Sequence, residues 1–208
     1  MKIRPAAMRA FAACAVLLWA AAVGAENRDD WQQPDRIVAD MALPAGAVVA
    51  DVGCGEGYLA FRLAKQVGES GKVFAMDISS KALDAVRRRI TREHRNNMEV
   101  IQSGSSDTRL QTASVESAVL CDVLHEMPVA DRLPLVRDIV RALKPGGLLF
   151  LIDYRKSHDV KFDPYEKLIP REDLLKLAND AGLALDAEFH YLKYQVFLRL
   201  RKPARTPR

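Results

Sequence analysis

Short apolar runs alternate with segments whose apolar residues recur every three or four positions, from residue 47 almost to the end of the chain. Apolar runs of this length are typical of buried strands, and the wider spacing is typical of helices with one buried face. Strands are expected at Ala47–Val52, Lys72–Asp77, Met98–Gln102, Ser117–Cys121 and Gly147–Tyr154. Strands that alternate with helices predict a mostly parallel sheet with helices on both faces.

The helices between these strands are expected at Tyr58–Val67, Ser79–His94 and Asp131–Leu143. A further helical segment, Asn27–Leu43, precedes the first strand and has Pro34 near its start. After the fifth strand come a long polar loop, Arg155–Ile169, and a last helix, Arg171–Ala181. A loop of this length is a candidate substrate lid.

Two alternating stretches close the chain, Leu185–His190 and Tyr194–Arg199. Alternation of apolar and polar residues over two neighbouring stretches is typical of an antiparallel hairpin. The fold class is therefore α/β: a Rossmann-like, doubly wound sheet of seven strands, mostly parallel, with a C-terminal antiparallel hairpin.

The first strand leads directly into a glycine-rich turn, Asp51-Val52-Gly53-Cys54-Gly55-Glu56-Gly57. Glycine allows positive φ angles and a close approach of ligand to backbone, and the helix that follows directs its free N–H groups at the same place. The dinucleotide fingerprint has its third glycine one residue later, where this chain has Tyr58. A pyrophosphate ligand is therefore disfavoured, and Asp51 is better suited to a cationic amine.

A second acid, Asp77, ends the second strand twenty residues after Gly57. In doubly wound folds an acid at this place binds the hydroxyl groups of a ribose. Together the glycines and the two acids predict a ligand that has a ribose and an amine but no phosphate.

These residues resemble the first motif and the ribose-binding acid of the class I S-adenosylmethionine-dependent methyltransferases. The resemblance covers most of the chain from about Trp31 onward and includes the turn Leu143–Leu149, which enters the fifth strand in many members. It implies S-adenosylmethionine as cofactor and methyl transfer as the reaction. The leading helical segment is expected to cover the cofactor cleft. The cofactor contacts that it implies are Asp51, Gly53, Gly55, Gly57, Asp77, Ile78, Ser106, Asp107 and Asp122.

The adenine contact departs from the pattern of the family. Many relatives have an acid after the third strand that holds the adenine amino group, and here Ser105 occupies its usual place while Asp107 follows two residues later. Either the backbone N–H of Ser106 or the side chain of Asp107 would make the contact, and a merely polar loop is an equal alternative.

Asp122, His125 and Glu126 follow the fourth strand, at the edge of the sheet where ligands of open α/β folds bind. His125 is a candidate general base, because imidazole exchanges protons near neutral pH. Glu126 would orient it or cap the next helix. The alternative is a structural histidine, and methyl transfer does not require a base, because alignment of the acceptor with the methyl group supplies much of the acceleration. Asp122–Glu126 and Asp30–Pro34 also resemble a bacterial, often exported subset of methyltransferase-like proteins.

Charge and composition limit the partners. The chain has 31 Lys and Arg against 27 Asp and Glu, but eight of the basic residues lie in the first 25 residues or the last ten, so the body is mildly acidic. Neither this charge nor any motif indicates a nucleic-acid substrate, and we expect a small-molecule methyl acceptor. A protein that binds S-adenosylmethionine or a similar nucleoside without transferring anything is the alternative.

Cys54 and Cys121 are expected to be buried thiols, since their spacing fits neither a metal site nor an assignable disulfide. No metal is expected.

The first 25 residues read as a cleaved signal peptide: a basic start, an apolar run, and small residues at Val23-Gly24-Ala25. The domain organisation is therefore a signal peptide at 1–25, a methyltransferase domain at 26–200 and a basic tail at 201–208. The apolar run is shorter than the roughly 20 residues that a membrane span needs. A periplasmic or secreted protein is expected, with a cytoplasmic location as the alternative because S-adenosylmethionine is made there. The sequence leaves the oligomeric state open.

Overall fold

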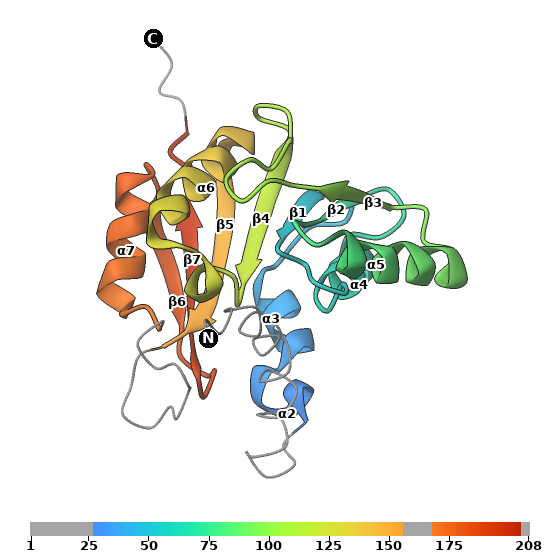
Figure 1. The fold of residues 1–208 in the computed structure, drawn as a ribbon, viewed down its shortest axis with the longest axis horizontal. Coiled ribbons are helices and arrows are strands. Elements are labelled where there is room, and N and C mark those ends of the chain that lie inside the picture. The colour runs from blue at the N-terminus through green and yellow to red at the C-terminus, as the bar shows by residue number, and fades with distance from the viewer. Residues whose placement is uncertain (1–26, 156–167, 205–208) are drawn as a thin grey trace, which may run out of the picture.

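The computed structural model describes residues 27–155 and 168–204. The predicted signal peptide, most of the loop after the fifth strand, and the last four residues lie outside these ranges. Seven strands form one sheet in the order β3-β2-β1-β4-β5-β7-β6 (Figure 1). The strands are β1 Val48–Val52, β2 Lys72–Asp77, β3 Met98–Gln102, β4 Val115–Cys121, β5 Leu143–Tyr154, β6 Ala184–Phe189 and β7 Gln195–Arg201.

Strands β1 to β5 pair in parallel, and β7 runs antiparallel to both β5 and β6. The predicted hairpin is therefore present, with its second strand inside the sheet and its first strand at the edge. The mostly parallel, seven-stranded fold class is confirmed.

Helices cover both faces of the sheet. They are α2 Arg28–Gln32, α3 Pro34–Asp40, α4 Ala60–Val67, α5 Ser80–Glu93, the 3-10 helix η1 Leu124–Glu126, α6 Val129–Ala142 and α7 Arg171–Asp180. One hydrophobic core contains Ile37 of α3, Leu63 of α4 and Leu83 of α5. A second core contains Ile139 of α6 and Leu174 of α7. The sheet is thus doubly wound, with α3, α4 and α5 on one face and α6 and α7 on the other.

The leading helical segment differs from the single element expected. It is divided into α2 and α3 at Gln33, whose φ of 50° and ψ of 53° are left-handed. The residue before a proline is disfavoured in the right-handed helical region, so Pro34 begins a new helix instead of continuing the first. Figure 1 shows α2 and α3 one after the other below the strands. From α2, Gln32 bonds Asp122 after β4, and Trp31 contacts Tyr154 at the end of β5.

Strands β4 and β5 begin earlier than the apolar runs suggested. Val115 pairs with Leu143, the register then shifts, and Ser117 pairs with Leu148. The expected turn before the fifth strand is therefore part of β5 as an irregular segment, with Gly146 at a φ of 77°. Helix α6 ends correspondingly one residue early, at Ala142.

The parallel strands bring the chemically interesting residues to one edge of the sheet. Strands β1, β2, β4 and β5 all end there, and antiparallel β7 begins there, since Gln195 pairs with Tyr154. The glycine turn, Asp77 and the residues after β4 consequently share this edge. Among residues 27–155 and 168–204, every helix is too short or too polar to cross a bilayer.

Candidate active site

The glycine turn after β1 is fixed to the neighbouring strand by its backbone. The N–H groups of Gly53 and Cys54 both donate to the carbonyl of Met76, at 2.8 Å. Gly53 has a φ of 77°, and a Cβ there would lie 2.4 Å from a methyl group of Val123. At Gly55, with a φ of 54°, a Cβ would meet nothing within 4 Å. The turn is therefore packed tightly at its first glycine and open at its second, where a ligand can approach the backbone.

Asp77 joins the glycine turn to the start of α5. One carboxylate oxygen accepts from the N–H of Gly55 at 2.9 Å, and the other accepts from the N–H of Ser79 at 2.8 Å. Ile78, the next residue, is 63% exposed although it is large and apolar. An exposed apolar side chain beside a carboxylate suits a flat, polar-edged ligand such as a nucleoside.

The loop after β3 lies beside Asp77, because the N–H of Ser103 donates to the Asp77 carbonyl at 3.0 Å. Ser106 is half-buried and Asp107 is exposed. One oxygen of Asp107 accepts from the N–H of Arg109 at 2.8 Å, within the loop itself. Both candidates for the adenine contact thus lie in the loop after β3, next to Asp77.

Asp51 is buried beneath the turn. Its side chain is 2% exposed, and its Oδ2 has no hydrogen-bond partner among the described residues. Burial raises the pKa of Asp51 to about 7, the nearby charge of Asp77 raises it further, and a backbone hydrogen bond from Ala60 and the charge of Arg28 oppose the shift. A buried acceptor without a partner is costly unless a ligand supplies a donor.

Asp122 is held by residues from both ends of the chain. Gln32 of α2 donates to its Oδ2 at 2.9 Å, Arg28 approaches the same oxygen at 3.3 Å, and Gln195 of β7 donates to Oδ1. Burial and the charge of Asp153 raise the pKa of Asp122, against the opposing effects of Arg28 and the two amides. Asp122 therefore connects α2 to the C-terminal hairpin.

His125 and Asp153 form a buried pair. His125 belongs to η1, is 4% exposed, and places its Nδ1 2.7 Å from Oδ1 of Asp153 at the end of β5. The other oxygen of Asp153 accepts from the N–H of Leu124 at 2.9 Å. Nε2 of His125 lies 3.3 Å from Glu126. Burial opposes the charged imidazolium, but the hydrogen bond and charge of Asp153 outweigh it and raise the pKa of His125.

Aromatic rings line the same edge next to this pair. The ring of Tyr154 meets His125 edge-on at 5.1 Å. Trp31 of α2 lies 6.1 Å from Tyr154 and 5.8 Å from Tyr194, measured between ring centroids. Helix α2 therefore contributes an aromatic residue to the β5–β7 part of the edge.

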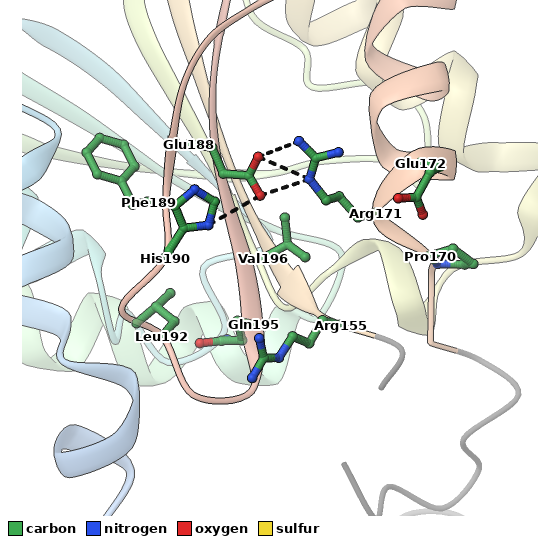
Figure 2. A pocket seen from close by; sticks show the side chains of 10 residues that line it. All are labelled: Arg155, Pro170, Arg171, Glu172, Glu188, Phe189, His190, Leu192, Gln195 and Val196. Atoms are coloured by element: carbon green, nitrogen blue, oxygen red, sulfur yellow. Dashed lines mark hydrogen bonds and ion pairs between the residues drawn. The ribbon is translucent and has the colours of Figure 1, made fainter. Parts of the chain in front are cut away.

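A cavity of about 510 Å³ lies further along the edge, beside β6 and β7 (Figure 2). Figure 2 shows Glu188 between Arg171 and His190, with Arg171 paired to it through two nitrogens. Gln195 lies in the wall of this cavity and also donates to Asp122. Gln195 thus lies between the cavity and Asp122.

Cys54 and Cys121, the two cysteines of the described residues, form no disulfide; Cys54 is buried and Cys121 is half-buried. Burial raises the pKa of both thiols. The described part of the chain contains no group of three or more His, Cys, Asp or Glu that could hold a metal ion.

A family model described as "Methyltransferase domain" matches residues 49–147, from the first strand to the start of the fifth. A SAM-dependent methyltransferase from Aquifex aeolicus superposes with a TM-score of 0.77 at 25% identity, covering 84% of this chain and 92% of that one. The fold and the matched domain are those of the class I S-adenosylmethionine-dependent methyltransferases, the family that the sequence motifs resemble. S-adenosylmethionine is the cofactor of this family.

Two curated relatives of this chain are named as quinone methyltransferases. It is 29% identical to the chloroplastic 2-phytyl-1,4-beta-naphthoquinone methyltransferase of Arabidopsis thaliana, over 73% of this chain and 58% of that protein. It is 31% identical to the demethylmenaquinone methyltransferase of Lactococcus lactis, over 52% of this chain and 42% of that protein. The chain thus spans about half the length of these relatives.

The residues at the edge fit S-adenosylmethionine chemically. Asp51 offers a buried acceptor without a partner, which suits an ammonium group. Gly55 leaves open space where any other residue would place a Cβ, and Asp77 lies beside it. These residues would hold the amine and the ribose of the cofactor.

The structure brings together most of the residues singled out from the sequence, and it adds four that were missed: Arg28, Gln32, Asp153 and Gln195. Asp153 had a visible signal, because it is an acid within an otherwise apolar strand. The other three carried no local signal, because their roles depend on contacts across the whole chain.

Proposed function

We propose that this methyltransferase transfers a methyl group from S-adenosylmethionine to a small aromatic acceptor of the quinol type. The observation that carries the proposal is the pairing of His125 with buried Asp153, on the same sheet edge as the open glycine turn. We call the glycine turn with Asp51 and Asp77 the cofactor cradle. Methyl transfer to a nucleophile that carries a proton requires a general base next to this cradle.

Bound S-adenosylmethionine supplies an electrophilic methyl group on its sulfonium. The role of the chain is to place the acceptor in line with it and to remove a proton from the acceptor. Asp153 holds Nδ1 of His125 in the protonated form, which leaves Nε2 to accept that proton. Asp153 then stabilises the imidazolium that forms, and exposed Glu126 lies close enough to Nε2 to pass the proton toward solvent.

Three features favour a planar aromatic acceptor. Trp31, Tyr154 and Tyr194 form an aromatic wall next to His125. Aromatic rings stack on one another in offset or edge-on geometry, so this wall suits a ring-shaped substrate. The cavity beside Gln195 gives room for a substituent, and its size is within the range of small-molecule sites. The quinone methyltransferases among the relatives point to the same substrate class.

The test has two stages. Calorimetry should first show that the protein binds S-adenosylmethionine and its demethylated product. Radiolabelled cofactor should then transfer its methyl group to reduced demethylmenaquinone or to a smaller dihydroxynaphthalene. Tight cofactor binding with no label in any of a broad set of phenols, amines and quinols would favour the binding-protein alternative instead.

Export to the periplasm remains part of the proposal, and it rests on the sequence of residues 1–25. N-terminal sequencing of the protein from fractionated cells should give a mature chain that begins at Glu26. An intact Met1 in the cytosolic fraction would place the reaction in the cytoplasm, where the cofactor is made.

A further inference from the structure

Arg28 of α2 lies between Tyr58, next to the glycine turn, and Asp122. Its guanidinium carbon lies 3.9 Å from the ring centroid of Tyr58, the residue that follows the last glycine of the turn. Its Nη2 is 3.3 Å from Asp122, and its Nε donates to Gln32. The side chain is 46% exposed, so it is accessible to a ligand.

The acids around this cleft make Arg28 important. Asp51 is buried there, Asp122 is half-buried, and Asp77 is joined to the glycine turn. The charge of Arg28 lowers the pKa of both Asp51 and Asp122. S-adenosylmethionine carries an amino-acid tail with an ammonium and a carboxylate. Asp51 can take the ammonium, but three acids would repel the carboxylate unless a cation lies close to it.

A second arginine nearby is already occupied. Arg62 also lies against Tyr58, at 5.0 Å, but its nitrogens bind Asp29, Asp35 and the carbonyl of Tyr58, each at 2.9 Å. Arg28 uses one nitrogen for Gln32 and one for Asp122, and a guanidinium has five N–H donors. Arg28 therefore has donors left for a carboxylate, which guanidinium groups bind in fork geometry.

We propose that Arg28 binds the α-carboxylate of S-adenosylmethionine and thereby selects ligands that carry the complete amino-acid tail. The inference rests on the proposed function in one respect, namely that S-adenosylmethionine binds at the glycine turn. Helix α2 then contributes directly to the cofactor site, with Gln32 and Asp122 holding the arginine in position. Cofactor binding and the position of α2 are consequently coupled through one side chain.

Calorimetric affinities of three ligands test the assignment on full-length mature protein. S-adenosylmethionine has the carboxylate and the amine, decarboxylated S-adenosylmethionine has only the amine, and methylthioadenosine has neither. Arg28→Gln should weaken S-adenosylmethionine by about tenfold or more, the effect of losing a charge-assisted hydrogen bond. It should leave methylthioadenosine unchanged and leave the decarboxylated compound unchanged or tighter, because a repelling cation has been removed.

Arg36→Gln is a matched control. Arg36 lies on α3, stacks on the ring of Tyr191 at 3.7 Å, pairs with Asp40 at 3.8 Å, and is 55% exposed. It has the same kinds of contact as Arg28 but none to the glycine turn or to Asp122 in the described structure. This variant should bind all three ligands as the wild type does, and thermal melting should show that both variants are folded.

The outcomes separate cleanly. An equal loss of affinity for all three ligands in Arg28→Gln would mean that Arg28 only holds α2 in place. Unchanged affinity for S-adenosylmethionine would mean that another group binds the carboxylate. Either result overturns the inference but leaves the proposed function intact. Tighter S-adenosylmethionine binding in the variant would identify Arg28 as a competitor of the cofactor and would also overturn it. If the wild-type protein binds no S-adenosylmethionine, the proposed function and the inference fail together.

Discussion

The two halves of the active edge are built in different ways. At the β1–β2 half, one contiguous turn and one acid form the site, and the contacts run through backbone N–H groups. At the β4–β5–β7 half, side chains distant in sequence meet: Asp122 bonds Gln32 across 90 positions and Gln195 across 73. A few glycines are enough to keep the backbone geometry of the first half. The shape and charge of the second half change when any one of several side chains is replaced. This difference suits a fold with a fixed cofactor and a variable acceptor.

The strongest way to separate the two halves is to disable the base without touching the cofactor cradle. In Asp153→Asn, the amide can donate to Nδ1 of His125 and so favours the tautomer whose Nε2 carries the proton. Nε2 then cannot accept a proton, and kcat should fall by about a hundredfold or more. The Kd for S-adenosylmethionine should stay within about twofold, measured by calorimetry on the same preparation.

His125→Asn provides the comparison for this variant. If the two residues act as a unit, the double variant should be no slower than the worse single variant. The pH profile adds a readout that a purely structural role would not change. Since the pKa of His125 is raised, the wild-type rate should increase with pH above the ordinary value of about 6.5. A rate that stays constant over this range, or full activity in Asp153→Asn, would return His125 to a structural role.

The complementary variant disables the cradle and leaves the base intact. Gly55→Ala places a methyl group in the open space that the ligand needs, and S-adenosylmethionine should bind about 10 to 100 times more weakly, a loss of about 1 to 3 kcal/mol. Gly146→Ala is the control, because Gly146 also has a positive φ, 77°, and also has open space at its Cβ, but lies within β5. Both variants should lose similar stability from backbone strain, and only the first should lose affinity. Equal affinities would place the ligand elsewhere.

The same contrast explains what could be predicted from the sequence. The cradle depends on local chemistry: a buried strand, glycines at alternate positions, and an acid at the end of the next strand. The parallel sheet order then brings Asp51, Gly55 and Asp77 together without further information. The mostly parallel fold and the closing hairpin were predictable for the same reason, since periodicity is a local property.

The β4–β5–β7 half depends on long-range geometry that periodicity does not encode. The amides of Gln32 and Gln195 resemble ordinary surface residues in sequence. They meet Asp122 only because α2 breaks at Gln33 and because β7 inserts next to β5. Asp153 was detectable as an acid in an apolar strand, but its pairing with His125 requires the register of β4 against β5.

A smaller effect is expected on stability, and it tests whether the cradle is strained before the cofactor binds. Asp51 has its pKa raised from 3.8 to about 7 by burial. In the window between these values the folded protein holds a proton that the unfolded chain has lost, so stability falls as the pH rises through it and is constant above. Asp51→Asn removes this loss of stability, because an amide does not ionise. The Tm of the variant should exceed that of the wild type by several degrees at about pH 8, and the difference in Tm should be smaller at about pH 5.

Asp138→Asn gives the opposite sign and serves as the control. Burial alone would raise the pKa of Asp138, but hydrogen bonds from Arg141 and Thr108 outweigh it and lower the pKa. That carboxylate stabilises the fold at neutral pH, and its loss should lower the Tm. Asp51→Asn should in addition weaken S-adenosylmethionine binding. A Tm unchanged by Asp51→Asn at about pH 8 would mean that the carboxyl has a partner in the free protein.

The smallest expected effect concerns the aromatic wall. Trp31→Leu keeps an apolar side chain on α2 but removes the ring that faces Tyr154 and Tyr194. Loss of one stacking contact, about 0.5 to 1.5 kcal/mol, should raise the KM for a quinol acceptor by about 2- to 12-fold. The Kd for S-adenosylmethionine should not change, and Trp31→Phe should restore most of the acceptor affinity because it restores a ring. If Trp31→Leu instead weakens the cofactor and spares the acceptor, α2 belongs wholly to the cofactor half of the edge, and the boundary between the two halves moves from Asp122 toward β5.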